Sequence, residues 1–244
     1  MKVLNNILKE IEISWRKPIE KALFSLDDDY LEFLQKDKRY FPDIYNFLNP
    51  FKTLGLNSTK YILFGQDPYP RKESAIGYAF IDAKVKNIFS SSGFSKEVNK
   101  ATSLRNFIKM LLVCENILNP DDLSQTAISN IEKTGLCQNM LALKDNFEKN
   151  GVLLLNTALI FTDKKESKYH LKKWKPFVET LLSEIENRDI KLIFFGEAAK
   201  NIEKIKSVKN FKKFKFIHPY NIEFIKNEKV HKLFKPMNLM KVQY

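Results

Sequence analysis

Residues 61–70 read Tyr61-Ile62-Leu63-Phe64-Gly65-Gln66-Asp67-Pro68-Tyr69-Pro70, an apolar run followed by a polar loop between two prolines. The apolar run is typical of a buried strand, and Gly65 permits a sharp turn where the strand ends. Pro68 and Pro70 fix their own φ angles and hold the preceding residues, Asp67 and Tyr69, in extended conformations. The segment therefore predicts a rigid loop at the carboxyl end of a strand, where open α/β sheets bind ligands. A proline-stiffened turn with a surface carboxylate is the simpler alternative.

The rest of the chain alternates strand-like and helix-like patterns. Short apolar runs predict strands near residues 60–64, 152–156, 192–195 and 214–217. Apolar residues at helical spacing predict helices near residues 104–117, 174–185 and 198–205. This order predicts a single-domain α/β fold, with a central, mainly parallel four-stranded sheet and helices on both faces.

The first 58 residues have helical spacing but no catalytic pattern, as the apolar positions Leu4, Ile7, Leu8 and Ile11 indicate. The acidic run Asp27-Asp28-Asp29 predicts the start of a further helix. We expect residues 1–58 to form a helical cap within the same domain as a catalytic part, residues 59–244. Residues 119–139 are polar and irregular, which predicts a mobile insertion.

Composition narrows the class of protein. The chain has 244 residues, of which 44% are hydrophobic and 29% charged, so we expect a globular protein with one sizeable core. No apolar run reaches the roughly 20 residues that a membrane span needs. Cys114 and Cys137 are the only cysteines, which predicts buried thiols in a reducing cytoplasm and excludes a four-cysteine iron–sulfur cluster. The three histidines are far apart in sequence, so we expect no metal site and no cofactor. The two cysteines, as thiols, predict a cytoplasmic protein.

The charge of the chain indicates a nucleic-acid partner. The formal net charge is +12, a balance typical of proteins that bind nucleic acids. Lysines are spread along the whole chain, so solvated surface charge is the alternative. The lysine-rich segment from Lys200 to Lys215 leads directly into His218 and could neutralise phosphates there.

Six segments, in order along the chain, resemble the motifs of family 1 uracil-DNA glycosylases. They are Gly65-Gln66-Asp67-Pro68-Tyr69, Ile76-Gly77-Tyr78-Ala79-Phe80, Ser103-Leu104-Arg105-Asn106, the run from Gly151 to Leu159, Ile193-Phe194-Phe195-Gly196 and His218-Pro219-Tyr220-Asn221-Ile222. The resemblance extends from about Tyr61 to Leu239. It implies a monofunctional glycosylase that flips uracil out of DNA, hydrolyses its N-glycosidic bond with water and leaves an abasic site for base excision repair.

The resemblance implies two catalytic residues and four base-binding residues. Asp67 would orient water and oppose the positive charge that develops on the sugar. His218 would donate a hydrogen bond to the uracil carbonyl that becomes an oxyanion. The base-binding residues would be Gln66 through its backbone, Tyr69 against the C5 edge, Phe80 by stacking and Asn156 by its amide. For each, a structural role in the turn or the core is the alternative.

The DNA-binding positions differ most from the family pattern. The resemblance places Ser103 at a phosphate, Ile222 as an apolar wedge in the duplex, and Pro70, Tyr220 and Asn221 at the DNA surface. Pro70 replaces the usual histidine, Tyr220-Asn221 replaces Ser-Pro, and Glu197 stands near a usual phosphate contact. The run Ser90-Ser91-Ser92-Gly93 replaces a proline-rich loop. We therefore expect single-stranded DNA to be a better substrate than duplex DNA.

Two alternatives stay open at this point. The first is a glycosylase of the same scaffold that excises another modified pyrimidine, for example in defence against phage DNA. The second is a non-catalytic DNA-binding or polymerase-accessory protein. Retention of Asp67, His218, Asn156 and Phe80 together argues against the second, and Tyr69 with Asn156 favours uracil. We expect a monomer whose partner is DNA, single- or double-stranded.

Overall fold

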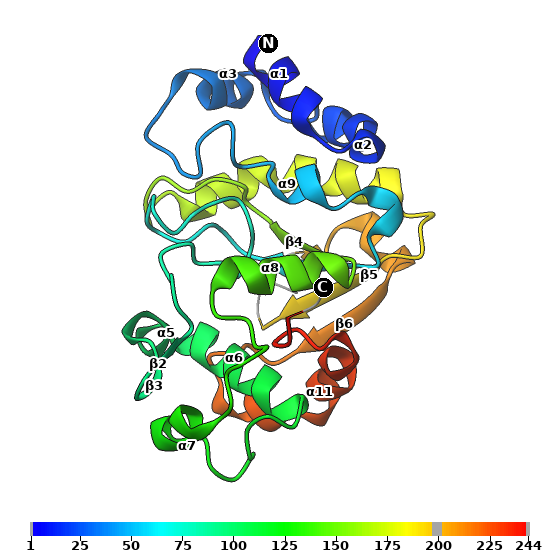
Figure 1. The fold of residues 1–244 in the computed structure, drawn as a ribbon. Helices are drawn as coiled ribbons and strands as arrows, with labels where there is room; N and C mark the ends of the chain where they lie inside the picture. The colour runs from blue at the N-terminus through cyan, green and yellow to red at the C-terminus, as the bar shows by residue number, and fades with distance from the viewer. Residues whose placement is uncertain (1, 197–201, 243–244) are drawn as a thin grey trace. The chain divides into compact units, whose positions relative to one another are not determined.

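The computed structural model describes residues 2–196 and 202–242, and it has the predicted α/β class (Figure 1). Its main sheet has four strands in the order β4-β1-β5-β6. The strands are β1 (Tyr61–Gly65), β4 (Val152–Asn156), β5 (Lys191–Phe195) and β6 (Lys212–Phe216). Strand β1 pairs in parallel with both β4 and β5. The prediction of a mainly parallel four-stranded sheet is therefore confirmed.

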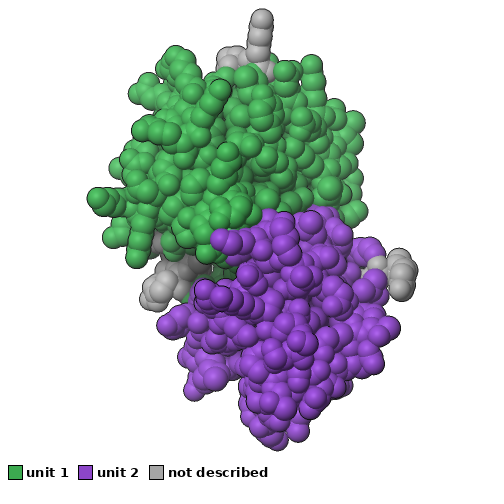
Figure 2. Space-filling model, turned by 60° about the vertical axis from the view of Figure 1, so that its left-hand side comes forward, with its two compact units in different colours: residues 1–81, 151–215 green, residues 82–150, 216–244 purple. Residues whose placement is uncertain are grey.

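The chain forms two compact units, which Figure 2 shows in different colours. Unit 1 contains residues 1–81 and 151–215, and unit 2 contains residues 82–150 and 216–244. The predicted division at residue 58 into a cap and a catalytic part stays a prediction.

In unit 1, helices pack around the sheet, and each helix buries one of its own faces. These helices are α1 (Lys2–Glu10), α2 (Ile13–Leu23), α3 (Asp28–Lys36), α4 (Pro50–Thr53), η1 (Leu56–Ser58), α9 (Ser167–Ile185) and η2 (Lys206–Asn210). Helix α2 packs against α9, and both contribute fully buried residues to one core, including Trp15 and Trp174. The indole of Trp15 donates a hydrogen bond of 2.9 Å to the carbonyl oxygen of Leu54. The N-terminal helices thus cover the sheet through α9.

Unit 2 is mostly helical. It contains β2 (Phe89–Ser90), β3 (Gly93–Phe94), α5 (Lys96–Lys100), α6 (Thr102–Cys114), α7 (Gln125–Asn130), α8 (Met140–Lys149), η3 (Ile222–Lys226), α11 (Glu228–Phe234) and η4 (Lys235–Met237). The ring of Phe107 on α6 contacts the rings of Phe147, Phe224 and Phe234. Helix α6 is therefore the centre of this unit, and the segment after His218 packs on it.

Several predicted boundaries need correction. Strand β6 begins at Lys212, two residues before the predicted start, because Lys212 and Lys213 precede its first apolar residue. Helix α9 begins at Ser167 rather than at Trp174, because its first turns are held by polar contacts rather than by an apolar stripe. Residues 119–139 include α7, which the Ser124 side chain caps and Ile128 anchors in the interior. The first half of the helix predicted at residues 198–205, residues 198–201, lies outside the described residues.

Cys114 and Cys137 are free and buried, as predicted, and burial raises the pKa of the Cys137 thiol to about 11. Among the described helices, none combines the length and the apolar character that crossing a membrane requires.

Candidate active site

The loop after β1 begins where a side-chain amide lies directly on the backbone. Gly65 pairs with Asn156 across β1 and β4. A Cβ atom at Gly65 would lie 2.3 Å from the Oδ1 atom of Asn156 and 2.9 Å from the Cβ atom of Ala79. Any larger residue at this position would displace the amide. The glycine of the motif is therefore needed for close approach of a neighbouring side chain.

Three hydrogen bonds from the end of β4 hold this loop in place. The backbone N–H groups of Thr157 and Ala158 donate to the carbonyl oxygens of Gly65 (3.0 Å) and Gln66 (2.9 Å). The hydroxyl of Thr157 donates a further bond of 2.7 Å to the Gln66 carbonyl. The Gln66 side chain itself is exposed. Gln66 thus sits on a backbone fixed by the neighbouring strand, at the carboxyl edge of the sheet.

Asp67 has a partner that the sequence did not reveal. The hydroxyl of Ser167, the first residue of α9, donates a hydrogen bond of 2.5 Å to the Oδ2 atom of half-buried Asp67. A bond to a carboxylate restricts its orientation and is stronger than a bond between neutral groups. Because the predicted helix began at Trp174, Ser167 fell in an unassigned segment and carried no signal.

The first turns of α9 are themselves anchored. Both ring nitrogens of buried His170 form hydrogen bonds. Nδ1 is bonded to the Tyr30 hydroxyl at 2.7 Å, and Nε2 to the Thr162 hydroxyl at 2.9 Å. Burial lowers the pKa of His170, so the ring is neutral at pH 7. Lys173 of α9 also forms an ion pair of 2.6 Å with Asp27. These contacts fix the start of the helix, and with it the hydroxyl that holds Asp67.

Asn156 and Phe80 supply groups suited to a planar ligand. Asn156 is only 2% exposed, and no described residue hydrogen-bonds its side-chain amide. A side-chain amide can both donate and accept hydrogen bonds, which suits it to the edge of a planar ligand. Phe80 is half-buried, has a φ of 64° and meets the ring of Phe195 edge to face at 5.4 Å. A bulky residue rarely adopts a positive φ outside sites where the surroundings impose it.

Tyr69 and Pro70 complete the candidates in unit 1. Tyr69 is half-buried and Pro70 is exposed. The backbone N–H of Arg71 donates to the Tyr69 carbonyl oxygen at 2.8 Å, so the loop turns back directly after Pro70. The structure thus brings Gln66, Asp67, Tyr69, Pro70, Phe80 and Asn156 together in one unit.

His218 lies in unit 2, in a tight turn that determines its tautomer. Its Nδ1 atom accepts a hydrogen bond of 3.1 Å from the backbone N–H of Tyr220, and its carbonyl oxygen accepts one of 2.9 Å from Asn221. The proton of the neutral ring is therefore on Nε2. The residue is exposed, yet partial desolvation of the ring lowers its pKa. His218 can thus act as a neutral donor through Nε2 near pH 7.

The loop after His218 is held by an amide on α6. Buried Asn106 donates a hydrogen bond of 2.8 Å to the carbonyl oxygen of Pro219. Asn106 stood in a quoted motif, but its role in holding this loop was not predicted. The side chains of Tyr220 and Ile222 project from the loop and are 71% and 68% exposed.

Two further DNA-binding candidates have local roles. The Oδ1 atom of Asn221 accepts from the backbone N–H of Glu223 at 3.0 Å and caps η3. Ser103 is half-buried in the first turn of α6, where Ala101 and not Ser103 occupies the N-cap position. Glu197 lies outside the described residues.

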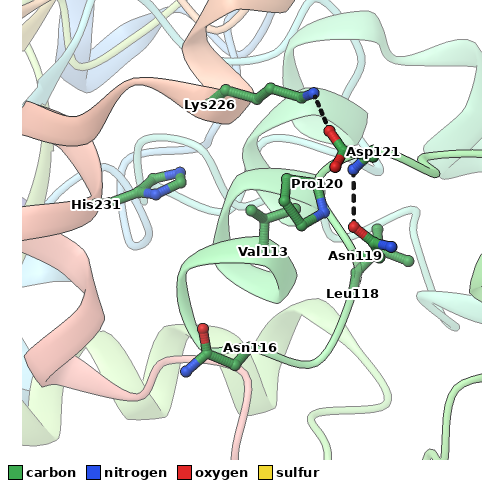
Figure 3. Close-up of a pocket in the computed structure, with 8 residues that line it drawn as sticks. All are labelled: Val113, Asn116, Leu118, Asn119, Pro120, Asp121, Lys226 and His231. Atoms are coloured by element: carbon green, nitrogen blue, oxygen red, sulfur yellow. Dashed lines mark hydrogen bonds and ion pairs between the residues drawn. The ribbon is translucent and has the colours of Figure 1, made fainter.

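In the part of the chain that the structure describes, no group of three or more His, Cys, Asp or Glu residues could hold a metal ion. Unit 2 has a separate hollow of about 630 Å³, drawn in Figure 3. Its polar groups bind one another, as in the ion pair of 3.1 Å between Lys226 and Asp121. His231 approaches the Ile225 carbonyl oxygen at 2.6 Å. None of the predicted site residues lines this hollow.

Known proteins that are similar to this chain, in sequence and in structure, include uracil-DNA glycosylases. The model of the uracil DNA glycosylase superfamily matches residues 51–243. The chain is 27% identical over 221 residues to the uracil-DNA glycosylase of Fusobacterium nucleatum, covering 90% of this chain and 83% of that protein. It is 48% identical to the wild-type UNG of Nitratifractor salsuginis, with a TM-score of 0.95 and coverage of 99% of this chain and 96% of that one. The mimivirus uracil-DNA glycosylase shares the fold, at 19% identity and a TM-score of 0.56.

Proposed function

This chain belongs to the uracil DNA glycosylase superfamily, and from this premise we propose how its residues excise uracil from DNA. The chain is a uracil-DNA glycosylase, a hydrolase that cuts the bond between the base and its sugar. The observation that carries the assignment of its site is the buried Asn156 amide, which lies against Gly65 at the sheet edge where Asp67 begins the next loop.

We assign Asp67 to the attacking water. As the C1′–N1 bond breaks, its electron pair leaves with the uracil ring, and the sugar gains oxocarbenium character. A carboxylate fixed by Ser167 opposes that positive charge and orients a water molecule towards C1′. The water oxygen bonds to C1′, and the carboxylate takes the released proton. Uracil leaves as an anion, which takes up a proton from solvent after release, and Asp67 loses its proton to solvent; the products are then uracil and an abasic site.

We assign His218 to the leaving group. The departing uracil carries negative charge on its carbonyl oxygen, and a neutral imidazole with its proton on Nε2 can donate a hydrogen bond to it. The lowered pKa of His218 keeps the ring neutral near pH 7. The residue then stabilises the anion without first having to lose a proton.

Base selection is assigned to Asn156, Tyr69 and Phe80. The Asn156 amide offers one donor and one acceptor to a pyrimidine edge, a pattern that matches uracil and opposes cytosine. Tyr69 would exclude the methyl group of thymine by shape. Phe80 would stack on the flipped ring, and its positive φ supports a position set by function.

The form of the substrate follows from the DNA-binding positions. We propose that Ile222 fills the space that the flipped base leaves, since its side chain is 68% exposed beside His218. Tyr220 would contact the DNA surface, and Ser103 a phosphate. Single-stranded DNA, which needs no wedge, would be the better substrate. The enzyme would act as a monomer in cytoplasmic base excision repair.

The proposal is tested with labelled oligonucleotides that each contain U, T, C or another modified pyrimidine at one position. Excision leaves an abasic site that alkali cleaves. We expect cleavage only at uracil, and faster in single strands than in duplex. Cleavage at another modified pyrimidine and not at uracil would show that the site is specific for that base and would refute the assignment to uracil.

A further inference from the structure

Unit 1 contains a cavity of about 460 Å³ that the chemistry above does not use. One wall is a face of α9 that carries Lys168, Leu171, Lys172, Lys175 and Val178. Lys168 lies three and four residues before Leu171 and Lys172, and Lys175 lies four and three residues after them, so these side chains share one side of the helix. The other wall is made by Ile202, Lys204 and Ile205. The aliphatic side chains of half-buried Leu171 and of buried Val178, Ile202 and Ile205 form the floor, and four exposed ammonium groups form the rim.

The cavity adjoins the catalytic loop. Thr157 lines it, and the hydroxyl of the same residue holds the Gln66 carbonyl oxygen at 2.7 Å. Lys168 follows Ser167, whose hydroxyl holds Asp67. A strand whose nucleotide is bound at Asp67 and Asn156 would thus have its neighbouring nucleotides close to this rim.

The rim is positively charged and largely unneutralised. Lys168, Lys172 and Lys204 form no hydrogen bond or ion pair with any residue that the structure describes. Lys175 has one acidic neighbour, Glu179, at 3.3 Å. A local excess of one sign raises the concentration of oppositely charged ligand at a surface. The cavity is therefore suited to an anion with an apolar portion.

We propose that this lysine-lined cavity is a subsite for the substrate strand, binding phosphates outside the flipped nucleotide. From Lys168 to Lys175 the helix rises about 10 Å, which is the axial distance that three phosphates of one strand occupy in B-form DNA, at about 3.4 Å each. The ammonium groups contact successive phosphates, and the aliphatic floor receives a sugar or base face. The inference rests on uracil-DNA glycosylase activity, and it assigns the cavity to the same strand.

The test is the triple variant Lys168→Gln, Lys172→Gln, Lys175→Gln. Its matched control is Lys9→Gln, Lys17→Gln, Lys38→Gln, which removes the same charge from exposed positions on or beside the N-terminal helices. Binding to a uracil-free single strand is measured from low to high salt. Each lost phosphate contact lowers the salt slope by about 0.7, so the rim variant should lose about 2 and the control almost nothing.

A second readout uses uracil-containing strands extended by one nucleotide at a time on either side. For the wild type and the control, KM should fall as the strand is extended on one side, and in the rim variant that fall should disappear while kcat is kept. If the rim variant keeps both the salt slope of binding and the dependence of KM on strand length, the inference is overturned. An acidic protein segment would then be the remaining candidate ligand for the cavity. An equal loss of salt slope in the rim variant and the control would also overturn the inference, because the loss would then come from the net charge and not from the cavity. Absence of uracil excision by the wild type would instead refute the activity, and the uracil-free strand would still test the subsite.

Discussion

Removing the Ser167 hydroxyl should slow excision without weakening DNA binding. The bond of 2.5 Å from Ser167 is made to a charged acceptor, Asp67, and such bonds contribute about 1.5–3 kcal/mol. If the Ser167→Ala variant loses that whole amount in the transition state, kcat falls by about 10- to 150-fold, at 1.36 kcal/mol for each factor of ten. KM should change little, because Ser167 holds the carboxylate and does not contact the base.

Single-turnover excision from a uracil-containing single strand measures the effect. Ser167→Thr keeps the hydroxyl and should restore most of the rate, whereas Ser183→Ala, an exposed serine near the other end of α9, should have no effect. Adding Ser167→Ala to Asp67→Asn should cost less than about threefold more, since coupled residues are not additive. A full second loss in the double variant, or no rescue by threonine, would refute the positioning role.

Three further outcomes are expected. Asn156→Asp should weaken discrimination between uracil and cytosine, and Tyr69→Ala should admit some thymine excision; unchanged base preference in both would contradict the pocket assignment. Ile222→Ala should slow excision from duplex more than from single strands, because only the duplex needs the vacated stack filled; equal slowing would remove the wedge. Burial raises the pKa of Glu115 to about 7 from 4.5, so the folded state binds a proton that the unfolded state releases. Stability should therefore fall by about 3 kcal/mol as pH rises from about 4.5 to 7, and Glu115→Gln should remove that fall in denaturant titrations at several pH values.

The sheet and its catalytic loop could be predicted because their signals are local. Tyr61-Ile62-Leu63-Phe64 and the strand ending at Asn156 are buried apolar runs, and the structure places both strands within a residue of the prediction. The predicted position of strand β6 differed from the observed one because Lys212, Lys213 and Lys215 interrupt its apolar pattern. A half-exposed edge strand lacks the continuous apolar run by which buried strands are found.

The supports of the site could not be predicted, because they are contacts between distant segments. Ser167 lies 100 residues from Asp67 in sequence, and Asn106 lies 113 residues from Pro219. Serine and asparagine are common in surface positions, so their type alone carries no signal. The tautomer of His218 likewise depends on a backbone N–H of the turn that follows it. Chemistry could be inferred from residue type at a strand end, whereas orientation needed the fold.

The most direct measurement compares wild type with Asp67→Asn, which leaves an amide oxygen to accept the Ser167 bond. Uracil release from a single-stranded oligonucleotide is followed in single turnover, with the DNA affinity of each protein measured separately. We expect the variant to bind the strand as the wild type does and to excise uracil about 10²- to 10⁴-fold more slowly. Excision by Asp67→Asn within about threefold of the wild-type rate would contradict this expectation, because no other residue has been assigned to the attacking water.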